Sequence, residues 1–96
     1  MNGIPQTVIE QLHHPDRSKR SEAVFALDRL DSPEKLPILI QALRSEADLF
    51  IREDITFAIM HMGAQAILAL IELLQDTNPQ IRHHASHVLG KIGDTR

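Results

Sequence analysis

Apolar residues recur along this chain with a short period and a long one. Within a segment they stand three or four places apart, which sets them on one face of a helix of about 3.6 residues per turn, whereas a strand would alternate. Along the whole chain, a five-residue apolar pattern ends at Leu12, Leu43 and Leu74, each 31 residues from the one before. A period of this length is typical of helical repeat proteins, whose units must stack to bury their apolar faces.

A second apolar pattern follows each copy of the first and is counted from an arginine. Apolar residues stand three, seven and ten places after Arg20, Arg52 and Arg82. These offsets again lie on one helical stripe. Each repeat therefore holds two helices, and the residues of this second stripe are Ala23, Leu27, Leu30, Ile55, Ile59, Met62, Ala85, Leu89 and Ile92.

Residues that favour helix starts stand four places before the three arginines. The side chains of Asp16, Asp48 and Asn78 can accept hydrogen bonds from the backbone amides of a first helical turn. Pro79 directly follows Asn78, at a position where its missing N–H costs nothing. Together with the apolar stripes, these signals predict helices over residues 5–14, 17–30, 33–45, 49–62, 64–76 and 79–92.

Prolines and glycines refine the expected helix ends. Ser32-Pro33 is expected to start the third helix, and Pro37 should then kink its first turn or delay its start. Gly63 and Gly93 follow the apolar stripes, so we expect both to end helices in the left-handed conformation.

Composition narrows the class of protein. The chain has 96 residues, of which 43% are apolar, and this suits a single domain over residues 1–96. It has no cysteine, so disulfides and thiolate metal sites are excluded. A formal net charge of −3 argues against a nucleic-acid partner, and the lack of a long apolar run argues against a membrane. With no signal-like segment at its start, the chain is expected to be cytoplasmic.

The last repeat carries the motifs of a known family. A resemblance to the short, phycobilin-lyase type of HEAT repeat rests on Leu-Gln-Asp at 74–76, Ile-Arg at 81–82 and Val-Leu-Gly-Lys-Ile-Gly-Asp at 88–94. The resemblance implies an all-α fold, an α-solenoid of three HEAT-like helix pairs in a right-handed superhelix. The second helices would line its concave face, and the three repeats would cover residues 5–31, 32–63 and 64–94.

Two roles are open for the arginines at the start of the second helices. Each follows its capping residue by four places, so its guanidinium can reach back to that side chain or to the carbonyls of the turn. A structural role is favoured, because an arginine tied to its own turn has few donors left for a ligand. Binding of an anion is the alternative. The expected structural set is Arg20, Arg52, Arg82, Asp16, Asp48 and Asn78.

Positions of the second helices outside the core stripe form the predicted partner-binding surface. In the resembled fold they point toward the concave face or the neighbouring repeat, which would create a groove of acidic groups, histidines and phenylalanines. Phe25 and Phe57 stand at equivalent positions, where they either anchor a partner or fill the space between second helices. The predicted surface consists of Glu22, Phe25, Glu53, Asp54, Phe57, His61, His84 and His87.

A transition-metal site is the candidate chemistry of the last repeat. His83 and His87 are one helical turn apart and suit chelation, with Glu53 or Asp54 from the preceding repeat completing the coordination sphere. Exposed histidines at this spacing are more often ordinary surface residues. Apart from this candidate metal, no cofactor is expected.

The same segment resembles part of a HEAT-repeat enzyme, deoxyhypusine hydroxylase, in which His-Glu pairs directly after such arginines hold iron. His83 matches the histidine of one pair, but His84 stands in place of its glutamate. The other two repeats have Glu53-Asp54 and Ser21-Glu22 at these places. Without a full set of pairs, oxygenase activity is not carried over from this resemblance.

These observations favour a non-enzymatic protein–protein interaction or scaffold module that binds another protein on its concave face. The sequence has no nucleophile–base pair, no Gly-rich phosphate loop and no strong metal motif. The alternative is a metal-binding or chromophore-handling protein, which the histidines and the lyase branch of the family suggest. End-to-end self-association is a further expectation, because an open flank on a terminal repeat invites association.

Overall fold

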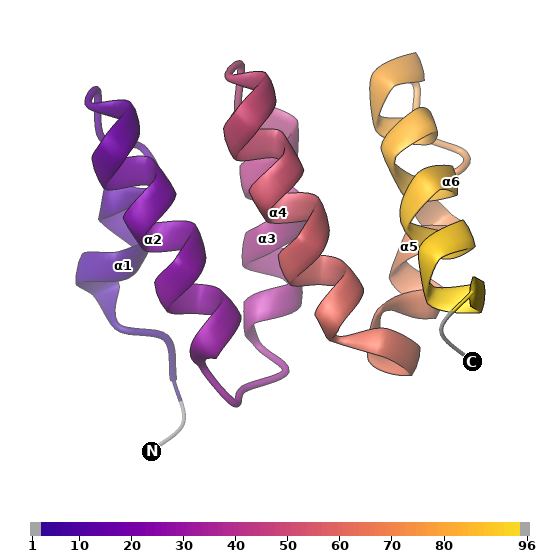
Figure 1. Ribbon diagram of the computed structural model, residues 1–96, viewed down its shortest axis with the longest axis horizontal. Coiled ribbons are helices and arrows are strands. Elements are labelled where there is room, and N and C mark those ends of the chain that lie inside the picture. Colours follow the sequence, from indigo (N-terminus) through magenta and orange to yellow (C-terminus); the bar gives the residue numbers. More distant parts are fainter. Residues whose placement is uncertain (1–2, 95–96) are drawn as a thin grey trace.

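The computed structural model describes residues 3–94, which form helices joined by short turns (Figure 1). No strand occurs in this part of the chain. The predicted all-α fold with six α-helices is therefore confirmed over these residues. The helices are α1 (Gln6–Gln11), α2 (Arg17–Arg29), α3 (Lys35–Ser45), α4 (Leu49–His61), the 3₁₀ turn η1 (Gly63–Ala66), α5 (Ile67–Leu73) and α6 (Pro79–Asp94).

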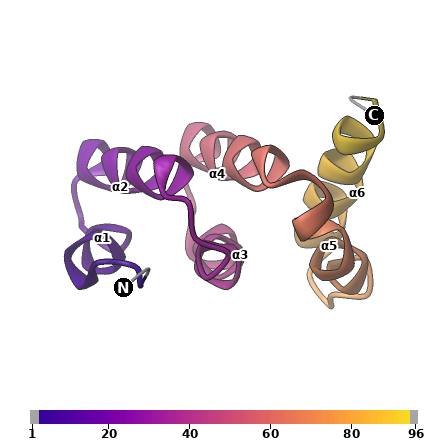
Figure 2. The same ribbon diagram turned by 90° about the horizontal axis from the view of Figure 1, so that it is seen from below.

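The helices form two layers (Figure 2). α1, α3 and α5 lie in one layer, and α2, α4 and α6 lie in the other. Each helix of the first layer packs on the following helix of the second layer, and within the second layer α2 packs on α4 and α4 on α6. Three helix pairs thus stand side by side, which is the HEAT-like arrangement that the 31-residue period predicts.

The apolar stripes predicted from the sequence form the core. Leu27, Ile59 and Ala85 of the second helices have no exposed surface, and Leu39 and Leu70 of the first helices are at most 1% exposed. Burying one aliphatic side chain of this size contributes about 1.5–3 kcal/mol. Because these residues come from all three pairs and join a single cluster, the stability of each pair depends on its neighbours.

No single helix within residues 3–94 has both the length and the apolarity needed to span a membrane. One consecutive pair of segments, Leu49–His61 and Gly63–Leu73, meets both criteria together but is bent by 112°.

Several helix boundaries differ from the prediction. α3 begins at Lys35 and not at Pro33, so Pro37 occupies its third position, where the backbone N–H has no intrahelical partner in any case. The proline therefore delays the helix without removing an internal hydrogen bond. α1 ends at Gln11, three residues early, because the chain already turns toward α2. α5 starts as a 3₁₀ turn, Gly63–Ala66, and becomes α-helical only at Ile67.

Only one of the two glycines expected to end a helix does so. Gly63 follows α4 with a φ of +59°, the left-handed conformation that a residue without a Cβ adopts at little cost. Gly63 stands at the point where the segments Leu49–His61 and Gly63–Leu73 are bent by 112°. Gly93 lies inside α6, which continues to Asp94, so the prediction for Gly93 is wrong.

Lys35 connects the first repeat to the second through its buried ammonium group. The residue is only 9% exposed, and its Nζ donates hydrogen bonds to the carbonyls of Asp28 at 3.1 Å and Leu30 at 2.7 Å. Both carbonyls belong to the end of α2, where a helix leaves carbonyls unpaired and where its dipole favours a cation. Lys35 thus caps one helix from the first turn of the next.

Replacing Lys35 by methionine should preserve the volume of the side chain and remove this cap. We expect the free energy of unfolding to fall by about 1–3 kcal/mol, because two carbonyls at the partly buried end of α2 lose their donor. Equilibrium unfolding in urea, followed by circular dichroism, measures the change. The matched control is Lys19→Met, since Lys19 is exposed. Equal midpoints for the two variants would show that the cap contributes nothing.

Candidate functional site

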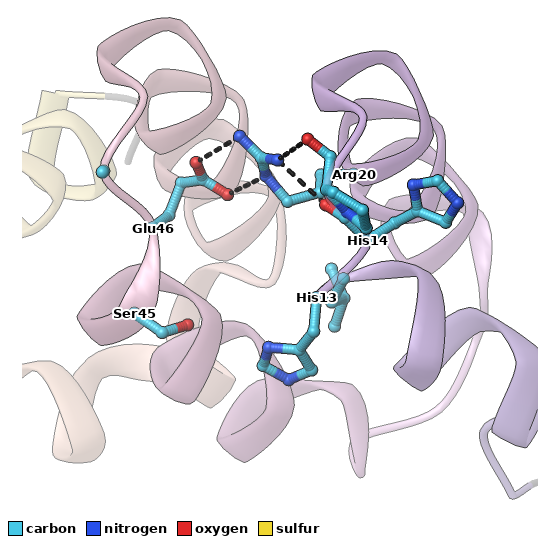
Figure 3. A pocket seen from close by; sticks show the side chains of 8 residues that line it. His13, His14, Arg20, Ser45 and Glu46 are labelled. Carbon is cyan, nitrogen blue, oxygen red and sulfur yellow. Dashed lines mark hydrogen bonds and ion pairs between the residues drawn. The ribbon is translucent and has the colours of Figure 1, made fainter.

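Arg20 ties the turn before α2 to the second repeat (Figure 3). Its Nε and Nη2 donate to the two carboxylate oxygens of Glu46 at 3.0 and 3.2 Å, and its Nη1 donates to the carbonyls of His14 and Pro15 at 2.9 and 3.1 Å. These contacts use four of the five N–H donors, and the carboxylate of Glu46 balances the charge of the guanidinium. The pocket in Figure 3, which His13 and Ser45 also line, therefore has no free cationic group from Arg20 to hold an anion.

The equivalent arginines differ from one another. Arg82 donates from Nη1 to the carbonyls of Asp76 at 2.7 Å and Thr77 at 3.3 Å, so it reaches back to its own turn. Arg52 instead donates from Nη1 to Gln80 Oε1 on α6 at 2.8 Å, and its buried Nε has no partner within residues 3–94. The expectation that every arginine binds its own turn is therefore wrong for Arg52. The reason is its burial: at 8% exposure it is turned toward the neighbouring repeat.

The three capping residues accept backbone hydrogen bonds. Asp16 accepts from Ser18, Asp48 from Phe50 and Ile51, and Asn78 from Gln80, with donor–acceptor distances of 2.9 to 3.2 Å. Burial opposes ionisation of Asp48, but the two amides and the nearby Arg17 outweigh it, so the pKa of this carboxyl is lowered. These side chains belong to the helix starts.

Glu46 is a structural residue that the sequence analysis missed. It stands six places before Arg52, at the place that Asp76 holds before Arg82. Each of these acids binds an arginine from a preceding helix: Glu46 binds Arg20, and Asp76 binds Arg44. The recurrence of an acidic residue six places before Arg52 and Arg82 is the sequence signal that could have identified Glu46 as a structural residue.

Polar side chains of the second helices meet at the junction between the first and second repeats. Ser21 Oγ lies 3.5 Å from a carboxylate oxygen of Asp54, and Nδ1 of His61 lies 3.0 Å from a carboxylate oxygen of Asp28. Two residues predicted to bind a partner, Asp54 and His61, are thus engaged by α2. Their position in the second helix sets them against the preceding repeat, which spacing alone does not reveal.

His84 occupies the corresponding place between the second and third repeats. It is half-buried on α6, and its ring centroid is 6.1 Å from that of His83. Burial lowers the pKa of His84, as do the positive charges of Arg52 and His83, whereas the carboxylate of Glu53 opposes the shift. A neutral imidazole beside a carboxylate is therefore held at this junction near neutral pH.

The predicted metal site does not assemble within the described part of the chain. No three histidine, aspartate or glutamate side chains of residues 3–94 come together in a way that could hold an ion. His83 and His87 are both exposed on α6, while Asp54 is directed to Ser21 on the other side of α4. The donor types suit a transition metal, but their arrangement here does not complete a site.

The remaining predicted surface residues lie open to solvent. Glu22, Glu53 and His87 are exposed, and Phe25 and Phe57 retain 48% and 46% of their surface. The two phenylalanines are thus only half covered by neighbouring helices. Phe25 borders a hollow that is also lined by Gln11, Glu22, Ala26 and Arg29.

Comparison with known proteins places this helical repeat chain in a family. The family described as PBS lyase HEAT-like repeat matches residues 19–45 and 51–76, more than half of the chain. The chain belongs to the PBS lyase HEAT-like repeat family. Neither matched segment includes α6, where the motifs of the repeat are plainest in the sequence.

Individual relatives are enzymes or biosynthetic proteins. The chain is 35% identical over 97 residues to deoxyhypusine hydroxylase of Homo sapiens, an alignment that covers 98% of the chain and 31% of the relative. It is 39% identical over 79 residues to deoxyhypusine hydroxylase of Arabidopsis thaliana, covering 79% of the chain and 25% of the relative. The bilin biosynthesis protein PecE of Mastigocladus laminosus is 40% identical over 62 residues, covering 64% of the chain and 23% of the relative.

These relatives overturn the expectation of a non-enzymatic scaffold. The chain aligns almost throughout its length with a hydroxylase, and further deoxyhypusine hydroxylases match most of it. The chain spans less than a third of the length of these relatives. The similarity therefore indicates an enzyme family, while the activity itself belongs to longer proteins.

The titration of His84 tests the electrostatics of the junction. Its midpoint should lie below 6.5, and Glu53→Gln should lower it further because that change removes the one anion that favours the imidazolium. Since the unfolded chain binds this proton more tightly, His84 should make folding less stable as the pH falls below 6.5. Imidazole chemical shifts measured by NMR give the midpoint. In the control, Glu10→Gln on α1 should leave it unchanged, and a rise in the Glu53→Gln variant would contradict the assignment.

Proposed function

We propose that this chain is part of a HEAT-repeat enzyme of the deoxyhypusine hydroxylase class. Its second-helix layer would contribute one side of the active site, centred on Glu53 and His84 at the junction of α4 and α6. The near-complete alignment with a deoxyhypusine hydroxylase supports the class. The arrangement around His84 supports the location.

The environment of His84 is the observation that carries the location. Perturbed histidines with a specific charged neighbour are enriched at functional sites. Here the half-buried imidazole has a lowered pKa and lies near Arg52 and Glu53, so it is neutral and able to accept a proton or to donate a nitrogen lone pair to a metal. Glu53 remains exposed beside it and can bind a cationic or hydrogen-bonding group of a substrate.

The resemblance to the hydroxylase implies an iron ion. Residues 3–94 do not form a site that fits iron by themselves. No three histidine, aspartate or glutamate side chains of these residues come together in a way that could hold the ion. No chemical step is therefore assigned to a metal held by this segment alone. The missing ligands would come from outside it, in keeping with relatives more than three times as long.

The exposed residues of the second-helix layer suit a long, positively charged substrate group. Glu22 and Glu53 provide negative charge on the second-helix layer, and Phe25 and Phe57 provide half-exposed apolar surface at equivalent positions of α2 and α4. Acidic groups attract a cation over several ångströms, and aromatic faces cover its methylene groups. This combination supports a deoxyhypusine-bearing peptide as the substrate.

Binding of a short peptide that carries deoxyhypusine tests this proposal without requiring turnover. Amide shifts recorded by NMR should change mainly on α4 and α6. Glu53→Gln and His84→Ala should each weaken binding by about tenfold, the effect of losing one charged hydrogen bond worth about 1.4 kcal/mol. The matched control is Glu10→Gln on α1, which should bind normally.

The same titration with other ligands separates the alternatives. A peptide with unmodified lysine should bind more weakly; equal affinity, or shifts confined to α1 and α3, would refute the proposed site. PecE is a bilin biosynthesis protein, so a bilin is the third ligand to be titrated. Shifts at α4 and α6 caused by the bilin and not by the modified peptide would replace the hydroxylase class with a bilin-handling one.

A further inference from the structure

Arg20 and Arg52 occupy equivalent places at successive junctions, but their guanidinium groups bind different partners. The edge of Arg20 formed by Nε and Nη2 donates to both carboxylate oxygens of Glu46 at 3.0 and 3.2 Å (Figure 3). Arg52 forms no ion pair within residues 3–94, and the one hydrogen bond of its guanidinium there joins Nη1 to Gln80 Oε1 at 2.8 Å. The charge of Arg20 is thus balanced by an acid, and that of Arg52 is not.

The acid equivalent to Glu46 is engaged elsewhere at the second junction. Glu46 and Asp76 each accept a hydrogen bond from the backbone N–H two residues on, at 3.0 Å. The side chain of Asp76 is one methylene shorter than that of Glu46, and its carboxylate pairs with Arg44. Arg52 is consequently left with an amide as its partner.

The junction that contains Arg52 lies inside the row of helices. α4 packs on α6, and the starts of both helices lie at the same edge of the row (Figure 1). The helices on both sides of this junction belong to the described part of the chain. The surroundings of Arg52 are therefore set by the second and third repeats themselves.

The free edge of Arg52 runs from the interior to the surface. Nε is buried and has no partner within residues 3–94. Nη2 donates to no group of these residues either but, unlike Nε, is not closed off from solvent. An oxygen of a ligand can therefore reach Nη2 from outside, and a small movement of the exposed Gln80 side chain opens the way to Nε. Because a buried charge without a counter-ion is costly, an anion at this edge is favoured.

The unbalanced charge of Arg52 acts on a neighbouring residue. Burial is the main cause of the lowered pKa of His84, and the positive charge of Arg52 is the next. A carboxylate paired with Arg52 would oppose this effect of its charge. The arginine therefore presents a net positive charge at the start of α6.

We propose that the Nε–Nη2 edge of Arg52 binds the carboxylate group of a ligand at the junction of α4 and α6. The ligand takes the role that Glu46 has against Arg20, with two parallel N–H···O hydrogen bonds. Its two oxygens match this edge of the guanidinium, and its single negative charge balances one arginine. The site stands on the contacts of Arg52 and does not depend on the proposed enzymatic function.

Titration of the 96-residue chain with sodium acetate tests the site by NMR, with chloride added to hold the ionic strength constant. We expect saturable shifts of the Arg52 Nε–H and of the first turn of α6 in the millimolar range. Bound acetate should also raise the titration midpoint of His84 toward 6.5, because it offsets the charge of Arg52.

A second probe, N-acetylglutamate α-amide, distinguishes the sources of the carboxylate. Tighter binding than that of acetate indicates the acidic side chain of a peptide as the ligand. Equal or weaker binding indicates a small free carboxylate. Either result supports the site, whereas a lack of saturation with both probes would overturn the proposal.

Two variants act on the site in different ways. Gln80→Glu places a carboxylate beside the guanidinium and should weaken acetate binding at least about tenfold, because it competes for the same charge. Arg52→Met removes the guanidinium and should abolish saturation, with unchanged circular dichroism as the check on folding. The matched control is Arg29→Met, which removes an exposed arginine from α2 and should bind acetate normally.

Gln80→Glu decides the outcome even if Arg52→Met fails to fold, because Gln80 is exposed. Acetate binding of unchanged strength in Gln80→Glu would contradict a site at Arg52. Equal shifts at exposed arginines such as Arg29 would show an adventitious ion only, and would likewise rule out the site.

Discussion

Each helix pair of this protein has apolar residues that only the next pair can cover. Leu27, Ile59 and Leu70 are fully buried because helices from neighbouring repeats lie against one another. A pair of helices this short is marginal by itself, since isolated helices of its length are unstable in water. Stacking is therefore the condition for folding as well as for the shape of the molecule.

Polar contacts at the junctions vary while the apolar contacts repeat. Between the first two repeats, Arg20 and Glu46 form a bidentate pair, and Asp28 pairs with His61. At the next junction Arg52 donates to an amide oxygen, that of Gln80, and its buried Nε has no partner among residues 3–94. The second junction is thus less well satisfied than the first. Incomplete pairing of this kind often accompanies a functional site, and His84 lies beside it.

The similarity to the hydroxylases concerns whole proteins that are longer than this chain. The geometry concerns this chain alone. The alignment covers nearly all of this chain but less than a third of the human relative. A segment of that size supplies a few repeats of a solenoid, and the ligands of a metal centre shared between repeats need not converge within it. A single junction with one perturbed histidine and one carboxylate is what such a segment can contribute.

The sequence by itself determined the helices, their apolar stripes and the residues that start them. These features are local or periodic: Asp48 caps a helix within its own turn, and Ile55 is buried because its place in the stripe repeats in every unit. Tertiary structure alone decided that Arg52 binds Gln80, that Asp54 turns to Ser21 and that burial depresses the pKa of His84. Those outcomes depend on which side chains of two separate helices meet, and the orientation of one repeat on the next sets that geometry. The 31-residue period specifies that the repeats stack but does not specify which polar groups come into contact.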